Sequence, residues 1–377
     1  MKDPAFAHRR TWTRVEEAAG VGDWGPDDTF QRECAKRIVL NRGARVSGRG
    51  GVGKSKLISH LVELFEAEGH RKVKVLASTH VQAANLNNAA TILAHLYDSS
   101  RSKELVLIID EMSMINTTIF AMLAEAAFVG AIFVILGDEF QIAPIGADVQ
   151  RWKMLPDSDF MHDLTNGLHV TLRKFRRKEK TEHGYALGDL QHFINVGSLY
   201  PKPDECEDAL LLTSIQRVRR LYPCDGRPVE TTLCVTNKRR VLVNASQNAR
   251  DKPALAIHCS YEGEDPKQQE MWIWPGLEVQ AAKTDKKHKL KNAVTHKVLQ
   301  IDEDTCQLSR GEETFNVPTK EMTNLFRLTH ALTIDSSQAR TLMGQILITE
   351  TDHPFFSLRR CIVALGRSPL ARNVQVQ

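Results

Sequence analysis

The sequence predicts an α/β protein built on parallel sheets, with a smaller β-rich insert toward its C-terminal end. Three observations predict this class. Fully apolar strands such as residues 105–109 alternate with amphipathic helices, which is typical of a parallel sheet covered on both faces. A glycine-rich turn joins one early strand to the helix that follows it. Between residues 254 and 320 the helical pattern stops, and turn residues separate short alternating strands.

Each element follows from its local pattern. The helix expected from residue 54 has apolar residues on one side and ends at Gly69, a residue that terminates helices well. The stretch 119–136 is long enough to span a bilayer, but cap residues precede it and Gly130 interrupts it, so a helix, a turn and a buried strand are expected. The expected strands are 45–47, 73–77, 105–109, 131–136 and 231–235, and the expected helices are 54–68, 81–96 and 238–247.

Length and composition limit the class of protein. The chain has 377 residues, which suggests two or three domains. A hydrophobic content of 42% and a charged content of 25% exclude a largely disordered chain. The seven cysteines are scattered, without a Cys-x-x-Cys pair, which favours reduced thiols in a soluble intracellular protein with no membrane segment. The net charge of +4 neither shows nor excludes a nucleic-acid partner.

A phosphate-binding loop is the strongest motif. It comprises Gly48, Arg49, Gly50, Gly51, Val52, Gly53, Lys54 and Ser55, which fit G-x-x-x-x-G-K-[ST] between a strand and a helix. Glycines let backbone N–H groups turn onto phosphate oxygens, and the helix N-terminus adds partial positive charge. Lys54 would reach the β- and γ-phosphates, and Ser55 would ligate Mg²⁺. An incidental glycine-rich turn is the alternative.

Two carboxylates follow the apolar strand 105–109. Asp110 and Glu111 would lie at the carboxyl end of that strand, where α/β sheets bind ligands. Asp110 would hold Mg²⁺ through water, and Glu111 would polarise the attacking water. Taken alone, such a pair is more often a solvated turn. Together with the phosphate-binding loop, it predicts an NTP-hydrolysing site.

Further motifs follow in a fixed order: Gly137-Asp138 with Gln141, then VTLRKFR at 170–176, LTIDSSQ at 332–338 and VALGR at 363–367. This ordered set resembles superfamily 1 helicases, and DEMSM at 110–114 resembles the motif of the RecD-like and petite-integration-frequency branch (superfamily 1B). The resemblance extends from about Asp27 to the C-terminus. It implies an ATP-dependent helicase or translocase that moves 5′ to 3′ on single-stranded DNA, in replication, repair or recombination.

The resemblance also implies a domain plan with two RecA-like motor domains and an insert. We expect an N-terminal extension at 1–26, a first motor domain at 27–163, a second at 164–253 and 321–377, and a barrel-like insert at 254–320. This compact domain organisation would suit a viral or mobile-element replication protein that acts as a monomer. Replication proteins would be its further partners.

Residue roles are carried over by position. Gln31 would read the adenine edge, Gln338 would lie at the nucleotide, and Gln141 would sense the γ-phosphate. Arg176 and Arg367 would come from the second domain and contact the γ-phosphate, an effect that is worth about 10³–10⁵ in rate. A solvated basic face is the alternative for Arg176. Nucleic acid would contact Thr79, His80, His95, Thr333, Ser336 and Ser337, although an ordinary surface or helix-face position is the alternative for both histidines.

Several positions differ from the branch pattern. Asp335 and Ser336 stand where His-Lys is usual. The sequence TIDSSQ at 333–338 also resembles a motif of helicases from positive-strand RNA viruses. Only residues 98–104 separate Tyr97 from the next strand, where the branch inserts a duplex-splitting hairpin. We therefore expect translocation with weak strand separation. The lysine-rich stretch 286–291 would track a nucleic-acid backbone or form a solvated face.

Three rival functions remain at this point. The first is a viral superfamily 1 RNA helicase or NTPase. The second is a P-loop NTPase that switches or loads partners without translocating. The third is a non-catalytic nucleic-acid-binding scaffold, which the intact Lys54, Asp110 and Glu111 disfavour.

Overall fold

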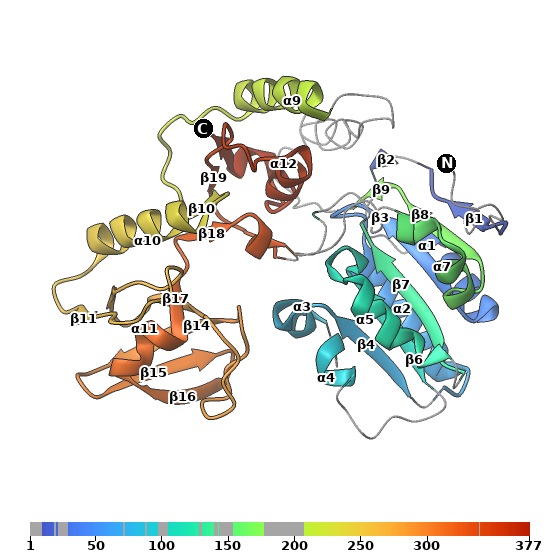
Figure 1. Cartoon of the computed structure of the whole chain (residues 1–377), viewed down its shortest axis with the longest axis horizontal. Helices are drawn as coiled ribbons and strands as arrows, with labels where there is room; N and C mark the ends of the chain where they lie inside the picture. The colour runs from blue at the N-terminus through green and yellow to red at the C-terminus, as the bar shows by residue number, and fades with distance from the viewer. Residues whose placement is uncertain are drawn as a thin grey trace. The chain divides into compact units, whose positions relative to one another are not determined.

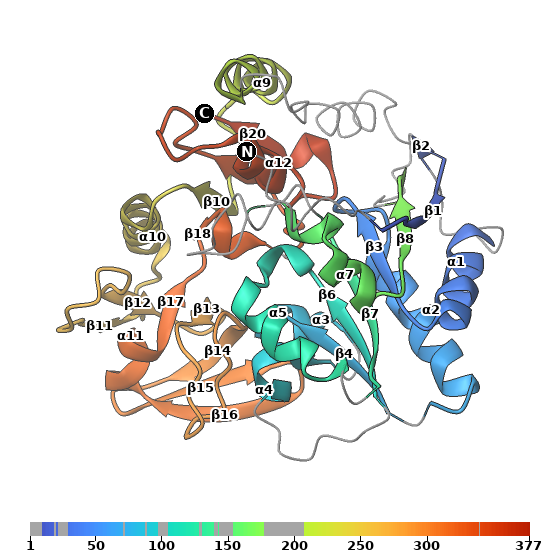
Figure 2. The same ribbon diagram turned by 45° about the vertical axis from the view of Figure 1, so that its right-hand side comes forward.

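The computed structural model divides the chain into two compact units, Met1–Asn195 and Val196–Gln377 (Figures 1 and 2). Within the described part of the chain, no helix combines the length and the apolar character needed to cross a membrane. The structure describes residues 10–18, 20–21, 29–70, 72–86, 89–96, 105–127, 130–138, 142, 154–176, 207–338 and 340–377.

The first unit is built on a seven-stranded parallel sheet in the order β1-β8-β3-β7-β6-β4-β5. A separate parallel pair joins the short strands β2 and β9. The strands are β1 (Thr13–Glu16), β2 (Gly20–Val21), β3 (Ala44–Gly48), β4 (Val73–Ala77), β5 (Ala90–Thr91), β6 (Val106–Asp110), β7 (Ile132–Gly137), β8 (Leu168–Leu172) and β9 (Lys174–Phe175).

Helices cover both faces of this sheet because neighbouring strand residues face opposite sides. Ile108 and Val134 pack in the cluster that contains α1 and α2, whereas Leu107 and Phe133 pack in the cluster that contains α5 and α7. The helices are α1 (Thr29–Asn41), α2 (Lys54–Ala67), α3 (His80–Asn85), α4 (Ile92–Leu96), α5 (Thr117–Ala124) and α7 (Asp159–Leu164).

Three expectations for this half need correction. The first unit continues past the boundary expected at residue 163, because β8 pairs with β3 and completes the sheet. Strand β1, which lies in the expected N-terminal extension, pairs with β8 and forms the sheet edge. The single helix expected over 81–96 is instead α3, β5 and α4. The helix, turn and strand expected within 119–136 are confirmed as α5 and β7.

The second unit contains a four-stranded parallel sheet in the order β18-β10-β19-β20. The strand expected at 231–235 and the helix expected at 238–247 are confirmed as β10 and α10. The elements are α9 (Glu207–Leu221), β10 (Thr231–Cys234), α10 (Asn237–Asp251), α11 (Met322–Leu325), β18 (Ala331–Thr333), β19 (Ile346–Ile348), α12 (Leu358–Leu365) and β20 (Val374–Val376).

The β-rich character expected between residues 254 and 320 is confirmed. Five antiparallel strands form a sheet in the order β16-β15-β14-β13-β17, and β11 and β12 form a separate hairpin. Their apolar residues, Val279 and Val298 among them, form one buried cluster. The strands are β11 (Ile257–Cys259), β12 (Met271–Ile273), β13 (Glu278–Ala281), β14 (Thr295–Ile301), β15 (Thr305–Arg310), β16 (Glu313–Pro318) and β17 (Phe326–Leu328).

Candidate nucleotide site

The predicted phosphate-binding loop lies between β3 and α2, at the carboxyl end of the sheet. Gly51 and Gly53 have φ angles of 87° and 96°, a region that favours glycine. Gly53 caps α2, so the first-turn N–H groups of this helix face the loop. Gly48 is needed for a different reason, because a Cβ there would lie 2.7 Å from Val52 Cγ2. The strand, loop and helix order predicted from the motif is confirmed.

The side chain of Lys54 is buried and folds back over this loop. Its Nζ donates to the carbonyl oxygens of Gly48 at 2.6 Å and Arg49 at 3.2 Å. Lys54 therefore holds an ammonium group against the loop. A phosphate oxygen could replace these carbonyls as the acceptor, with the gain of a charge-assisted bond.

Two carboxylates stand beside this charge at the end of β6. Loss of water around Asp110 and the charge of Glu111 raise the pKa of Asp110 to about 6, while Lys54 opposes the shift. Glu111 is buried, has a φ angle of 62°, and accepts a hydrogen bond from Ser113 Oγ at 2.6 Å. Two neighbouring carboxylates with little water are the environment that a divalent cation stabilises. Ser55, in the first turn of α2, carries the hydroxyl that a P-loop offers to Mg²⁺.

The end of β7 approaches this turn closely. A Cβ on Gly137 would lie 2.8 Å from Met112 Cβ and 3.0 Å from the Met112 backbone nitrogen. Glycine at this position therefore lets β7 pass the residue that follows Glu111. Asp138 is buried next to it. Gln141, expected to sense the γ-phosphate, lies outside the described residues.

The side chain of Gln31 lies against the phosphate-binding loop. Its Nε2 donates to the carbonyl oxygens of Val52 at 3.1 Å and Gly53 at 3.5 Å. The side chain is 1% exposed, and among the described residues Oε1 has no hydrogen-bond partner. A buried acceptor without a partner is costly. The exocyclic amine of adenine is a donor that would satisfy Oε1, so Gln31 fits the role that the resemblance implies.

Arg176 does not belong to the second unit, and this expectation is corrected. It follows β9 in the first unit and is fully buried. Its backbone N–H donates to Gly51 O at 2.8 Å, and Nη1 donates to Val52 O at 3.0 Å. The guanidinium also pairs with Glu17. The solvated basic face considered for Arg176 is therefore wrong, because its side chain is completely buried.

Arg367 is in the second unit, as expected, and is also buried. Its Nε donates to Val363 O at 2.9 Å, and Nη1 donates to Ser337 O and Arg340 O, each at 3.3 Å. These carbonyls hold the guanidinium against the turn that follows β18. Gln338 in this turn is buried, and its Nε2 has no partner among the described residues.

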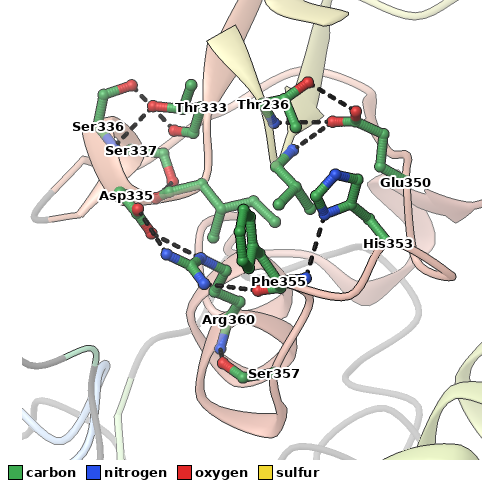
Figure 3. Close-up of polar contacts among 12 residues, drawn as sticks. Thr236, Thr333, Asp335, Ser336, Ser337, Glu350, His353, Phe355, Ser357 and Arg360 are labelled. Atoms are coloured by element: carbon green, nitrogen blue, oxygen red, sulfur yellow. Dashed lines mark hydrogen bonds and ion pairs between the residues drawn. The ribbon is translucent and has the colours of Figure 1, made fainter.

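The late serine motif forms a compact turn at the end of β18 (Figure 3). Ser336 Oγ donates to Thr333 O at 2.9 Å, and Thr333 Oγ1 accepts from the Ser336 N–H at 3.2 Å. Ser337 Oγ donates to Ile334 O at 2.7 Å and is completely buried. Ser337 thus stabilises the turn, and its hydroxyl does not reach a surface where nucleic acid could bind, contrary to expectation.

The other expected nucleic-acid contacts lie in the first unit. Thr79 caps α3, and its hydroxyl and backbone N–H form a capping box with Gln82. His80 begins the same helix, and His95 lies in the short helix α4, both partly exposed.

Three residues that sequence reasoning missed organise these sites. Glu17 binds the guanidinium of Arg176. Arg360 pairs with Asp335 in the late serine motif. Glu350, with a φ angle of 59°, accepts from the Val235 and Thr236 N–H groups at 2.7 and 2.9 Å (Figure 3). No local pattern marks these residues, because each partner is distant in the sequence.

A family model described as an AAA domain matches residues 28–191. The RecD subunit of the Mycobacterium tuberculosis RecBCD enzyme is 27% identical over 222 residues, covering 48% of this chain and 37% of that protein. The matched region is thus little more than a third of that relative's length.

Solved structures match nearly the whole chain. The Candida albicans Pif1 helicase has a TM-score of 0.61 at 19% identity, covering 92% of this chain and 93% of that one. Bacteroides Pif1 in complex with ADP-AlF3 and single-stranded DNA has a TM-score of 0.60 at 16% identity, covering 92% and 91%. At these identities the likeness establishes the fold alone. Pif1 helicases with this fold have two RecA-like domains.

Proposed function

We propose that this chain, a RecD/Pif1-like member of superfamily 1, hydrolyses ATP to move along single-stranded DNA in the 5′ to 3′ direction. One observation carries the proposal. The loop that carries Lys54 follows β3, and Asp110 and Glu111 stand at the carboxyl end of β6 in the same parallel sheet, which is the arrangement found in P-loop phosphoryl-transfer sites. The ssDNA and ADP-AlF3 complexes of the Bacteroides relative support both ligands.

Each residue would have a defined role in this reaction. Lys54 and the loop N–H groups would bind the phosphates, and Gln31 would bind adenine. Ser55 and Asp110 would hold Mg²⁺, which neutralises charge on the phosphates when bound. Glu111 would orient and deprotonate the attacking water. Replication, repair or recombination would be the setting for such a motor.

The decisive experiment is the ATPase rate of the purified chain with no polymer, with single-stranded DNA, or with single-stranded RNA. Lys54→Ala should lower kcat by roughly 10²–10³, because it removes the cation that meets the phosphates. Lys56→Ala is the matched control, since Lys56 lies one half-turn further along α2 and is exposed.

The outcomes separate the rival functions. Stimulation by DNA supports the proposal, and stimulation by RNA alone supports the viral RNA helicase. A rate that neither polymer changes supports the switch or loader. Chelation of Mg²⁺ should abolish hydrolysis in the wild type. Equal rates for the two lysine variants would overturn the assignment of the site.

A further inference from the structure

The N-terminal segment lies along one edge of the first sheet, where it pairs with β8 and then with β9. β1 pairs with β8 from Thr13↔Leu168 to Glu16↔Thr171, and β2 pairs with β9 from Gly20↔Lys174. Glu17 lies where the two strand pairs are interrupted. Its backbone N–H still donates to Thr171 O at 2.9 Å, but its side chain turns into the interior.

The carboxylate of Glu17 fills this interruption. Oε2 accepts from the backbone N–H groups of Arg173 at 3.0 Å and Lys174 at 2.9 Å, and from Arg176 Nη1 at 3.1 Å. Oε1 accepts from Arg176 Nη2. Four donors therefore converge on one carboxylate that is 4% exposed. Such a carboxylate fixes both the chain after β8 and the orientation of the guanidinium.

Arg176 connects Glu17 to the phosphate-binding loop. Its backbone N–H binds Gly51 O, and its Nη1 binds Val52 O, the same carbonyl oxygen that Gln31 Nε2 contacts. Two buried side chains from different parts of the chain thus hold one carbonyl of the loop. The orientation of the peptide that follows Val52 depends on both, and that peptide's N–H belongs to the phosphate-binding turn.

Both charges of this pair are shielded from solvent, since the Arg176 and Glu17 side chains are 0% and 4% exposed. Loss of either residue would remove a buried ion pair, which is far more costly than loss of a surface pair. The pair therefore acts as a unit.

We propose that Glu17 is a positioning residue of the nucleotide site, which acts through Arg176 to hold Gly51 and Val52 in the shape that binds the phosphates of ATP. The inference rests on the proposed function for the identity of the nucleotide. It assigns a role in ATP affinity to the segment between β1 and β2, which precedes every recognised motif of the motor.

The test uses the full chain and a double-mutant cycle of Glu17→Gln and Arg176→Gln. Glutamine keeps an acceptor for the Arg173 and Lys174 N–H groups but removes the charge and one of the two acceptor oxygens. Glu17→Gln should raise KM for ATP about tenfold, and the dissociation constant of ADP should rise in parallel. Its affinity for single-stranded DNA without nucleotide should stay unchanged.

Glu16→Gln is the matched control. Glu16 is the preceding residue and pairs with Arg173 at 2.7 Å between the same two segments, but both side chains are about half exposed, at 44% and 48%. Its KM should change less than twofold, as for a surface ion pair. Glu17→Gln added to Arg176→Gln should have no further effect on KM, because the partner is already absent.

Folding and function are separated by thermal unfolding without nucleotide. Each single variant should be less stable than the double variant, because the double variant removes both buried charges together. A folded double variant with wild-type ADP affinity would overturn the inference, as would equal KM values for Glu17→Gln and Glu16→Gln. Failure of the proposed function would be distinguishable from this result. Lys54→Ala would then have the same kcat as Lys56→Ala, independently of the KM measured for Glu17→Gln.

Discussion

Arg360 forms a two-pronged ion pair with Asp335, with Nε donating at 3.0 Å to one carboxylate oxygen and Nη2 at 2.8 Å to the other (Figure 3). Asp335 begins the turn that holds Ser336 and Ser337, and Arg360 lies in the first turn of α12. Asp335 is one of the positions where this chain differs from the branch pattern. The pair therefore shows how the altered motif is kept in place.

Asp335→Asn should loosen this turn, because it removes the charge that orders Arg360. We expect the free energy of unfolding of the second unit to fall by about 1 kcal/mol, and affinity for single-stranded DNA to fall a few-fold. Thermal unfolding and fluorescence anisotropy measure the two effects. Asp352→Asn is the control, since Asp352 also meets an arginine at 2.8 Å but is 83% exposed. Identical behaviour of the two variants would contradict this role.

Gly137→Ala should slow catalysis through the backbone of the neighbouring turn. The added Cβ would lie 3.0 Å from the Met112 nitrogen, so the peptide after Glu111 must move. Overpacking of this kind costs about 1–3 kcal/mol, and a displaced Glu111 should lower kcat at least tenfold. In Gly69→Ala, the new Cβ meets only open space at a φ angle of 87°. This control should lose about 1 kcal/mol of stability and keep its kcat.

Acid should destabilise the first unit through His169. Burial, Arg45 and Arg14 lower the pKa of His169 from 6.5 to about 3, although Asp157 opposes them. The folded chain keeps this ring neutral, whereas the unfolded chain protonates it below pH 6.5, so stability falls as the pH drops from about 6.5 toward 3. Down to about pH 4.5 the loss should reach roughly 3 kcal/mol.

Hydrogen exchange of β3 and β8 amides in wild type and His169→Gln measures this contribution. The variant should lose stability at neutral pH, because Ser47 Oγ contacts His169 Nε2 at 2.6 Å. Its protection should then depend less on pH than that of the wild type. Parallel pH profiles for the two proteins would show that His169 does not titrate on unfolding.

The lysine-rich stretch 286–291 forms the ordered loop between β13 and β14. Asp285 Oδ1 accepts from the His288 N–H at 2.9 Å, and Leu290 is buried beneath the loop, while Lys286 and Lys289 are exposed. If these lysines track a backbone, Lys286→Gln with Lys289→Gln should reduce the slope of log affinity against log salt by about 0.7 per lost phosphate contact. The control is Lys36→Gln with Lys56→Gln, on α1 and α2. An unchanged slope would identify the loop as a solvated face.

Strand separation should be weak compared with translocation. This prediction rests on the length of the loop 98–104, which lies outside the described residues. Seven residues are too few for a stable two-stranded wedge. The purified chain should show DNA-stimulated ATPase activity and displace a bound protein from a single strand, but unwind a forked duplex slowly. Rapid unwinding by the chain alone would contradict the prediction.

Local patterns predicted the elements and motifs that depend on neighbouring residues. The glycines and Lys54 of the phosphate-binding loop needed only their spacing, and Asp110 and Glu111 needed only the apolar strand before them. The burial that gives the two carboxylates their chemistry could also be expected, since a strand apolar on both faces must be central in a sheet.

Contacts between distant residues could not be predicted in the same way. Glu17 and Arg176 are 159 positions apart, and a glutamate next to another glutamate gives no sign of which one is buried. Ser337 shows the same limit at short range. Serine is equally suited to a phosphate contact and to a turn, and only the closed turn shows that its hydroxyl donates to Ile334.

The place of β1 at the edge of the first sheet has a consequence for synthesis on the ribosome. Thr13 pairs with Leu168, so β1 leaves the ribosome about 155 residues ahead of its partner strand. At about 5–20 residues per second, it waits roughly 10–30 s before β8 exists. β1 can therefore join the sheet only after β8 has been made, and Glu17 can meet Arg176 only after that delay.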